Sequence, residues 1–144
     1  MAGKILPYEG IWTRAEVAAD LNNFYLFGEN EEDYLGTYVP SITQAVIRNL
    51  PNSVGVITKH DRKLSANSFL KDSEADSYAI YIDNLRLALK IYLSRGHNIF
   101  VPMKDGQVLL GTGKAKMPEK APKCYKLLCE MIKELFDEFG NKNE

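Results

Sequence analysis

Apolar residues along this chain occur in two patterns, as short uninterrupted runs and as longer stretches with helical spacing. Uninterrupted apolar runs are typical of strands in a parallel sheet that is covered on both faces. They predict central strands at residues 24–27, 53–58 and 98–103, together with an edge strand at 4–7 and a short strand at 107–110. The sheet is therefore expected to be mostly parallel.

Helical spacing predicts the elements that connect these strands. Thr13 and Glu16 have the spacing of a capping box, in which each side chain satisfies the other residue's backbone N–H, so a short helix is expected from Arg14 to about Asp20. Three longer helices are expected at about 40–50, 73–95 and 122–139. A glycine directly follows each of the last two, as is common where a helix ends.

Two of these helices carry expectations about burial. In the helix at 40–50, the residues expected to face the core are Ile42, Ala45, Val46 and Leu50. The helix at 73–95 has one apolar stripe with the spacing of a core-facing helix, and a second stripe is made of Ile80, Leu87 and Ile91. The second stripe predicts that this helix is covered on more than one side.

The alternation of strands and helices indicates an α/β fold. The length of 144 residues suits one domain. We therefore expect a single three-layer α/β sandwich over residues 1–140 and a frayed tail at 141–144. In such folds, ligands bind where the parallel strands end. The stretches after the expected strands, at 28–30, 58–59 and 111–114, should therefore converge on one crevice.

Composition excludes several classes of function. Lys and Arg together number 18 and Asp and Glu together number 19, a balance that argues against general nucleic-acid binding. No apolar run approaches the ~20 residues of a membrane span, and the amino terminus lacks the apolar core of a secretion signal. The two cysteines, Cys124 and Cys129, form no metal-binding motif and are expected to pack as small apolar residues. We expect a cytoplasmic protein with no membrane segment, no metal and no cofactor.

The stretch Gly111-Thr112-Gly113-Lys114 lies between an expected strand and the last expected helix. Glycines let the backbone approach an anion closely, the amino terminus of the following helix attracts negative charge, and Lys114 adds a positive charge. The spacing differs from that of a Walker A loop. We interpret the stretch as an anion-binding loop, with a plain glycine turn and an exposed lysine as the alternative.

The other two strand ends supply further candidate ligand-binding residues. Gly28, Glu29 and Asn30 follow the first central strand and could contact a ribose or a phosphate, although the same residue types are common in plain turns. Thr58 and Lys59 end the second central strand, and Lys59 forms a small basic patch with His60 and Arg62. The patch could neutralise a phosphate, although a solvated loop is the favoured alternative.

Tyr34 and Tyr38 lie on either side of Gly36, in the loop after the first central strand. Exposed tyrosines in such a loop could stack on a nucleobase or form part of a protein interface. Covering the core is the alternative role for either of them.

Support for catalysis is limited. No serine or cysteine lies in a recognisable nucleophile motif. The acid–base candidates near the expected crevice are Glu29, Asp33 and Asp61, and acidic loop residues of this kind are also commonly solvated. The polar stretch at 60–71 is a candidate lid over the crevice. No catalytic residue is assigned.

Four ordered stretches carry a resemblance to a known family: Trp12-Thr-Arg14, Phe24 to Asn30, Pro51 to Lys59, and Gly111 to Ala115 with Pro118 to Pro122. They resemble a family of small proteins found mainly in bacteriophages and bacteria. That family in turn resembles a divergent branch of the macro-domain-like α/β fold, whose members bind ADP-ribose and related nucleotides at strand ends. The resemblance implies a nucleotide-type ligand, with matching positions at Gly28, Asn30, Thr58, Lys59, Gly111, Thr112, Gly113 and Lys114.

Three functions stay open on the sequence. The first is non-catalytic capture of a small nucleotide-derived ligand, either an ADP-ribose derivative or a cyclic nucleotide signal. In a phage, this would make the protein a sponge for a host immune signal in the host cytoplasm. The second is hydrolysis of an ADP-ribosyl or phosphate ester bond, with Glu29, Asp33 or Asp61 activating water. The third is inhibition of a host protein through the loop that carries Tyr34 and Tyr38. We favour the first function, and self-association as a homo-oligomer is a further expectation.

Overall fold

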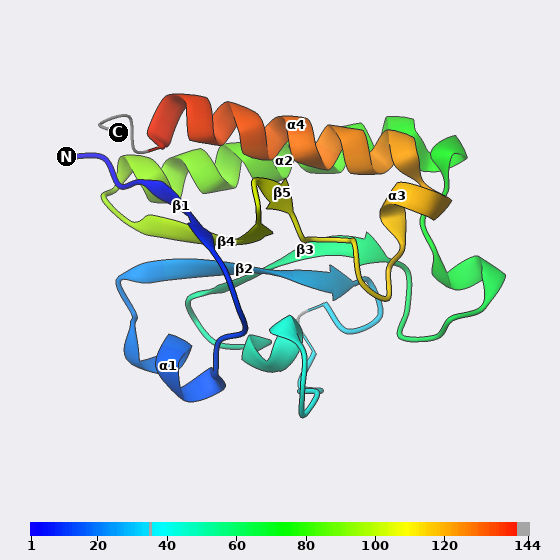
Figure 1. Ribbon diagram of the computed structural model, residues 1–144, viewed down its shortest axis with the longest axis horizontal. Coiled ribbons are helices and arrows are strands. Elements are labelled where there is room, and N and C mark those ends of the chain that lie inside the picture. The colour runs from blue at the N-terminus through cyan, green and yellow to red at the C-terminus, as the bar shows by residue number, and fades with distance from the viewer. Residues whose placement is uncertain (35, 141–144) are drawn as a thin grey trace.

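The computed structural model describes residues 1–34 and 36–140 and contains a five-stranded sheet (Figure 1). Four strands run parallel in the order β1 (Ile5–Tyr8), β4 (Asn98–Lys104), β2 (Asn23–Asn30) and β3 (Ser53–Lys59), and β5 (Gln107–Val108) pairs antiparallel with β4. The prediction of an α/β fold with a mostly parallel sheet is confirmed. The tail expected at 141–144 lies outside the described residues.

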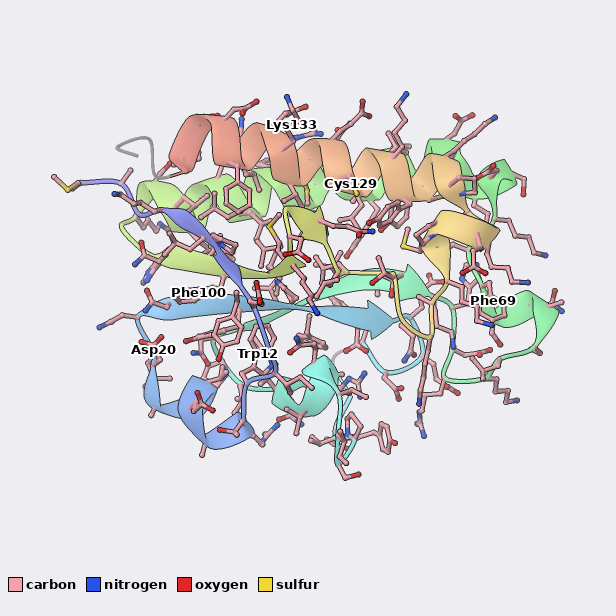
Figure 2. All side chains as sticks on the ribbon, in the orientation of Figure 1. Trp12, Asp20, Phe69, Phe100, Cys129 and Lys133 are labelled. Carbon is pink, nitrogen blue, oxygen red and sulfur yellow. The ribbon has the colours of Figure 1, made fainter. Side chains whose placement is uncertain are left out.

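Helices cover both faces of this sheet. The long helices α2 (Ala75–Ser94) and α4 (Pro122–Phe139) lie on one face, and α1 (Arg14–Ala19) and the 3₁₀ turn η1 (Gln44–Ile47) lie on the other (Figure 1). A large core forms between the sheet and the two long helices, and a smaller one around Trp12 and Tyr25 fills the opposite side. Figure 2 shows Trp12 and Phe100 on that side of the sheet. Within the described ranges, no helix is long and apolar enough to cross a membrane.

Elements with strong local signals form where the sequence predicts them. Thr13 caps α1 and makes the reciprocal hydrogen bonds of the capping box with Glu16. α2 ends just before Gly96, which takes a φ of +95°. A short 3₁₀ turn, η3 (Asp72–Glu74), leads into α2, which therefore begins two residues after its expected start at residue 73.

The helix expected at 40–50 is wrong, because only the four residues of η1 are helical. Side chains from the 12–14 segment take the carbonyl groups that a helix there would use: the Trp12 indole N–H donates to the Gln44 carbonyl (3.1 Å), and Arg14 donates to the Val46 carbonyl (3.0 Å). Ile42, expected to face the core, is 77% exposed. Contacts distant in sequence therefore override the local helical spacing.

The second apolar stripe of α2 is exposed, which contradicts the prediction that this helix is covered on more than one side. Ile80, Leu87 and Ile91 are 66%, 62% and 42% exposed, respectively. α2 lies in an outer layer whose core contacts come from one face, with α4 beside it.

The strand at 53–58 forms as β3 but lies at an edge of the sheet, so its predicted central position is wrong. Side chains of α2 satisfy part of its backbone, because the Tyr81 hydroxyl accepts from the Ile57 N–H (2.9 Å) and the Tyr78 hydroxyl donates to the Ile57 carbonyl (2.7 Å). The expected strand at 107–110 is shortened to the two residues of β5.

Candidate functional site

A cavity opens between β2 and β4 at the carboxyl ends of these two strands. Their pairing stops at Tyr25 and Phe100, two residues before Pro102, which has no N–H to donate to a neighbouring strand. Past this point, Gly28 to Asn30 of β2 line one part of the cavity and Pro102 of β4 lines another. Its volume of about 440 Å³ lies in the range of small-molecule sites.

The cavity brings together most of the candidate residues from the sequence. Those that line it are Gly28, Glu29, Asn30, Tyr38, Thr58, Lys59, Gly111, Gly113 and Lys114. Two candidates lie outside the lining: Tyr34 is 51% exposed, and the Thr112 hydroxyl turns back to donate to the Leu109 carbonyl (2.7 Å). Residues from all three stretches, at 28–30, 58–59 and 111–114, therefore meet at this one cavity, as expected for the crevice.

A buried ion pair forms the floor between β2 and η1. The guanidinium of Arg48 donates to both carboxylate oxygens of Glu29, with an Nε–Oε2 distance of 2.7 Å, and also to the carbonyl of Tyr38 (2.8 Å). Gly55 on β3 leaves room for this pair, since a Cβ there would lie 3.0 Å from the Cβ of Glu29. Sequence reasoning missed Arg48, because no periodic or motif signal links it to a carboxylate 19 residues away.

A second ionic group lies at the rim. Asn30 and Asp33 exchange two hydrogen bonds of 2.9 Å, and the Arg62 guanidinium donates to Asp33 (2.8 Å) while lying over the Tyr38 ring, 4.2 Å from its centroid. Burial by itself would raise the pKa of Asp33, but hydrogen bonds from Asn30 and Arg62 outweigh this effect and lower it. Asp33 is therefore held as a carboxylate anion at neutral pH. From the candidate lid at 60–71, the cavity is lined by Asp61 and Arg62.

The glycine loop contributes backbone donors. In the described part of the chain, the N–H groups of Gly113, Lys114 and Ala115 have no hydrogen-bond acceptor, and all three residues line the cavity. Gly111 takes a φ of +79°, and a Cβ at this position would lie 2.4 Å from the Met117 sulfur, so a side chain here would be strained and glycine is favoured. α4 (Pro122–Phe139) forms where the sequence predicts it, and a short helix that was not predicted, α3 (Met117–Lys120), lies between the loop and α4.

Two lysines bring positive charge to the same cavity. Lys59 is buried, and its ammonium donates to the Lys63 carbonyl and lies 5.4 Å from the centroid of the Phe69 ring. Burial lowers the pKa of Lys59, the negative charge of Asp61 opposes this shift, and the positive charge of Lys114 lowers the pKa further. Lys114 is exposed at the mouth and makes no ion pair with the described residues. An anion between these two lysines would relieve their mutual repulsion.

The cavity therefore combines positively charged side chains with backbone donors, which are groups that suit an anion. Two of its cations, Arg48 and Arg62, are paired with Glu29 and Asp33, while Lys114 and the loop amides are left without protein partners within residues 1–34 and 36–140. Over the same ranges, no cluster of three or more metal-ligating side chains occurs.

The fold and the cavity define an α/β protein with a mostly parallel sheet and a cavity at the carboxyl ends of its parallel strands. The chain belongs to the family described as "Family of unknown function (DUF7831)", whose model matches residues 7–131. No curated protein and no solved structure matches the chain.

Proposed function

We propose that this protein captures a small phosphate-bearing nucleotide ligand, of the ADP-ribose or cyclic nucleotide class, and holds it without cleaving it. The observation that carries the proposal is that one cavity is lined by Lys59, by Lys114 and by three loop residues whose N–H groups lack protein acceptors within the described residues. Backbone N–H groups in a glycine loop, together with lysine side chains, are a recurrent way of binding phosphate.

The remaining walls suit the uncharged part of such a ligand. Tyr38 presents an aromatic ring, and apolar surface comes from Pro40, Ala45 and Leu110. Ligand sites of this kind combine a mostly apolar lining with a few polar groups that fix orientation. A nucleotide offers both an anionic phosphate and a flat apolar base.

Capture is favoured over hydrolysis because the acidic candidates are poorly suited to act as bases. The Glu29 carboxylate is buried in its ion pair with Arg48. Hydrogen bonds from Asn30 and Arg62 lower the pKa of Asp33, and the Ser68 hydroxyl and the Lys63 N–H lower that of Asp61. An effective general base at neutral pH has a pKa nearer to the working pH.

The motifs in the sequence also support two more specific ideas, a likeness to macro domains and a role in a bacteriophage. A likeness to macro domains fits a parallel sheet with a nucleotide crevice at its strand ends, and in a bacteriophage, stoichiometric capture of a host nucleotide signal would make the protein a sponge. Both ideas rest on the motifs in the sequence, and they rank below the general proposal of nucleotide capture.

Titration calorimetry with ADP-ribose, AMP, cyclic ADP-ribose and cyclic AMP tests the proposal, with adenosine as the control that lacks phosphate. We expect at least one phosphate-bearing probe to bind with one site per chain and far more tightly than adenosine. Chromatography of the released ligand should return it intact. Failure of all four probes to bind would refute capture, and conversion of the bound probe would favour hydrolysis instead.

A further inference from the structure

One residue of the cavity lining, Gln44, carries a hydrogen-bond acceptor that has no partner in the described residues. The side-chain oxygen Oε1 of Gln44 is buried and accepts no hydrogen bond from residues 1–34 or 36–140. Gln44 is also one of the residues that line the cavity. Buried polar atoms in folded proteins are nearly always hydrogen bonded, so an orphaned acceptor beside a ligand cavity calls for an explanation.

The orientation of the Gln44 side-chain amide is fixed by the hydrogen bond that its nitrogen donates. The Gln44 Nε2 group donates to the carbonyl of Gly10 (3.1 Å), and the backbone carbonyl of Gln44 accepts from the Trp12 indole N–H (3.1 Å). Exchanging the amide oxygen and nitrogen would place two acceptors against each other, because a backbone carbonyl cannot donate. Oε1 is therefore committed to accepting a hydrogen bond.

We infer that the Gln44 oxygen accepts a hydrogen bond from an N–H or O–H group of the bound ligand and thereby determines which ligands the cavity accepts. This inference rests on the proposed nucleotide capture. A phosphate cannot fill the role, because its oxygens at neutral pH are acceptors like Oε1 itself. The donor must belong to the uncharged part of the ligand, which means an amino group of the base or a hydroxyl of the sugar.

The placement of Gln44 suits this role. It reaches the cavity from η1, whereas Lys114 and the loop amides reach it from the segment after β5. One ligand can therefore contact both, with its phosphate at the glycine loop and its donor at Gln44. Because the oxygen is buried, contact with a ligand requires a local shift of Gln44 or of its neighbours, and the nearby wall residues Pro40 and Thr43 lie outside helices and strands.

The test combines one substitution with ligands that lack one donor at a time. Gln44→Met keeps the length of the side chain and removes the acceptor, and Gln107→Met makes the same change at an exposed position on β5. Titration calorimetry uses AMP, purine riboside 5′-monophosphate (which lacks the 6-amino group), and the 2′-deoxy and 3′-deoxy forms of AMP. Thermal unfolding confirms that each variant is folded.

For wild type and Gln107→Met, we expect removal of one donor from AMP to weaken binding about tenfold, the size of a typical hydrogen-bond effect. The analogue that shows the loss identifies the donor as the base amino group or one of the two hydroxyls. For Gln44→Met, AMP should bind as weakly as that analogue, and removing the donor should cause no further loss.

Two results would overturn the inference. One is equal weakening of every probe by Gln44→Met, which would show a general effect on cavity shape. The other is unchanged binding of AMP by Gln44→Met. Either result would leave the proposed nucleotide capture intact, because capture is judged by the binding of AMP to the wild-type protein, which neither result changes. If the wild-type protein binds none of the four probes, the inference and AMP capture both fail.

Discussion

Lys114 is the residue whose removal should affect ligand binding most while leaving the fold unchanged. It is exposed at the mouth of the cavity and makes no ion pair within the described ranges. Replacing it with alanine takes one positive charge from the proposed phosphate site and breaks no described contact. The expected result is weaker binding of ADP-ribose with unchanged stability.

The size of the loss follows from Coulomb's law. Unit charges about 4 Å apart interact by about 1 kcal/mol in water and about 4 kcal/mol at an effective dielectric constant of about 20. Because Lys114 is exposed, the lower part of this range applies. A loss of about 1–2 kcal/mol corresponds to about 5–30-fold weaker binding. Added salt should weaken wild-type binding more than binding by Lys114→Ala, because mobile ions screen exposed charges.

Titration calorimetry with ADP-ribose at low and high salt measures both effects. The matched control is Lys133→Ala, because Lys133 lies on the outer side of α4 (Figure 2) and pairs with Asp137 at 3.6 Å. This control should bind ADP-ribose like the wild type at both salt concentrations. Equal affinities for Lys114→Ala and Lys133→Ala would refute the phosphate site at the glycine loop.

Three further predictions concern stability. Arg48→Met leaves the Glu29 carboxylate buried without its partner and should lower the free energy of unfolding by about 3–5 kcal/mol in urea titrations; an effect below ~1 kcal/mol would contradict the buried pair. Gly111→Ala places a side chain at a φ of +79° beside Met117 and should cost at least about 1–2 kcal/mol in the same assay, whereas Gly113→Ala, whose Cβ meets open space, should cost less. Burial would lower the pKa of His60, but hydrogen bonds with Glu31 and Glu74 outweigh this effect and raise it above 6.5. The protonated His60 therefore stabilises the fold below pH 6.5, and this stabilisation is lost as the pH rises through the raised pKa. The free energy of unfolding should therefore decrease more between about pH 6 and about pH 9 for the wild type than for His60→Asn. An equal decrease for both proteins would contradict the ionic contacts of His60.

Local signals predicted the elements that depend on neighbouring residues. The capping box of Thr13 and Glu16 lies within a single turn, so the residues that form it could be recognised from neighbouring positions alone. The segment at 40–50 behaves differently, because its carbonyl groups are taken by Trp12 and Arg14, more than 30 residues away. No window of local sequence contains that information.

The same distinction applies to the site. Gly28, Lys59 and Gly113 could be placed together from the sequence because the carboxyl ends of parallel strands share one edge of a sheet. Arg48 and Gln44 could not be found in this way, since they reach the cavity from a segment that was expected to be a regular helix. Their roles depend on the tertiary contacts that make this segment irregular.

The most direct test of phosphate capture follows the loop N–H groups themselves. In a nuclear magnetic resonance titration of ¹⁵N-labelled protein with ADP-ribose, we predict saturable shifts at the backbone amides of Gly113, Lys114 and Ala115, with the amide of Lys133 unmoved. Saturating binding that leaves these three loop amides unshifted would contradict the claim that this loop holds the phosphate.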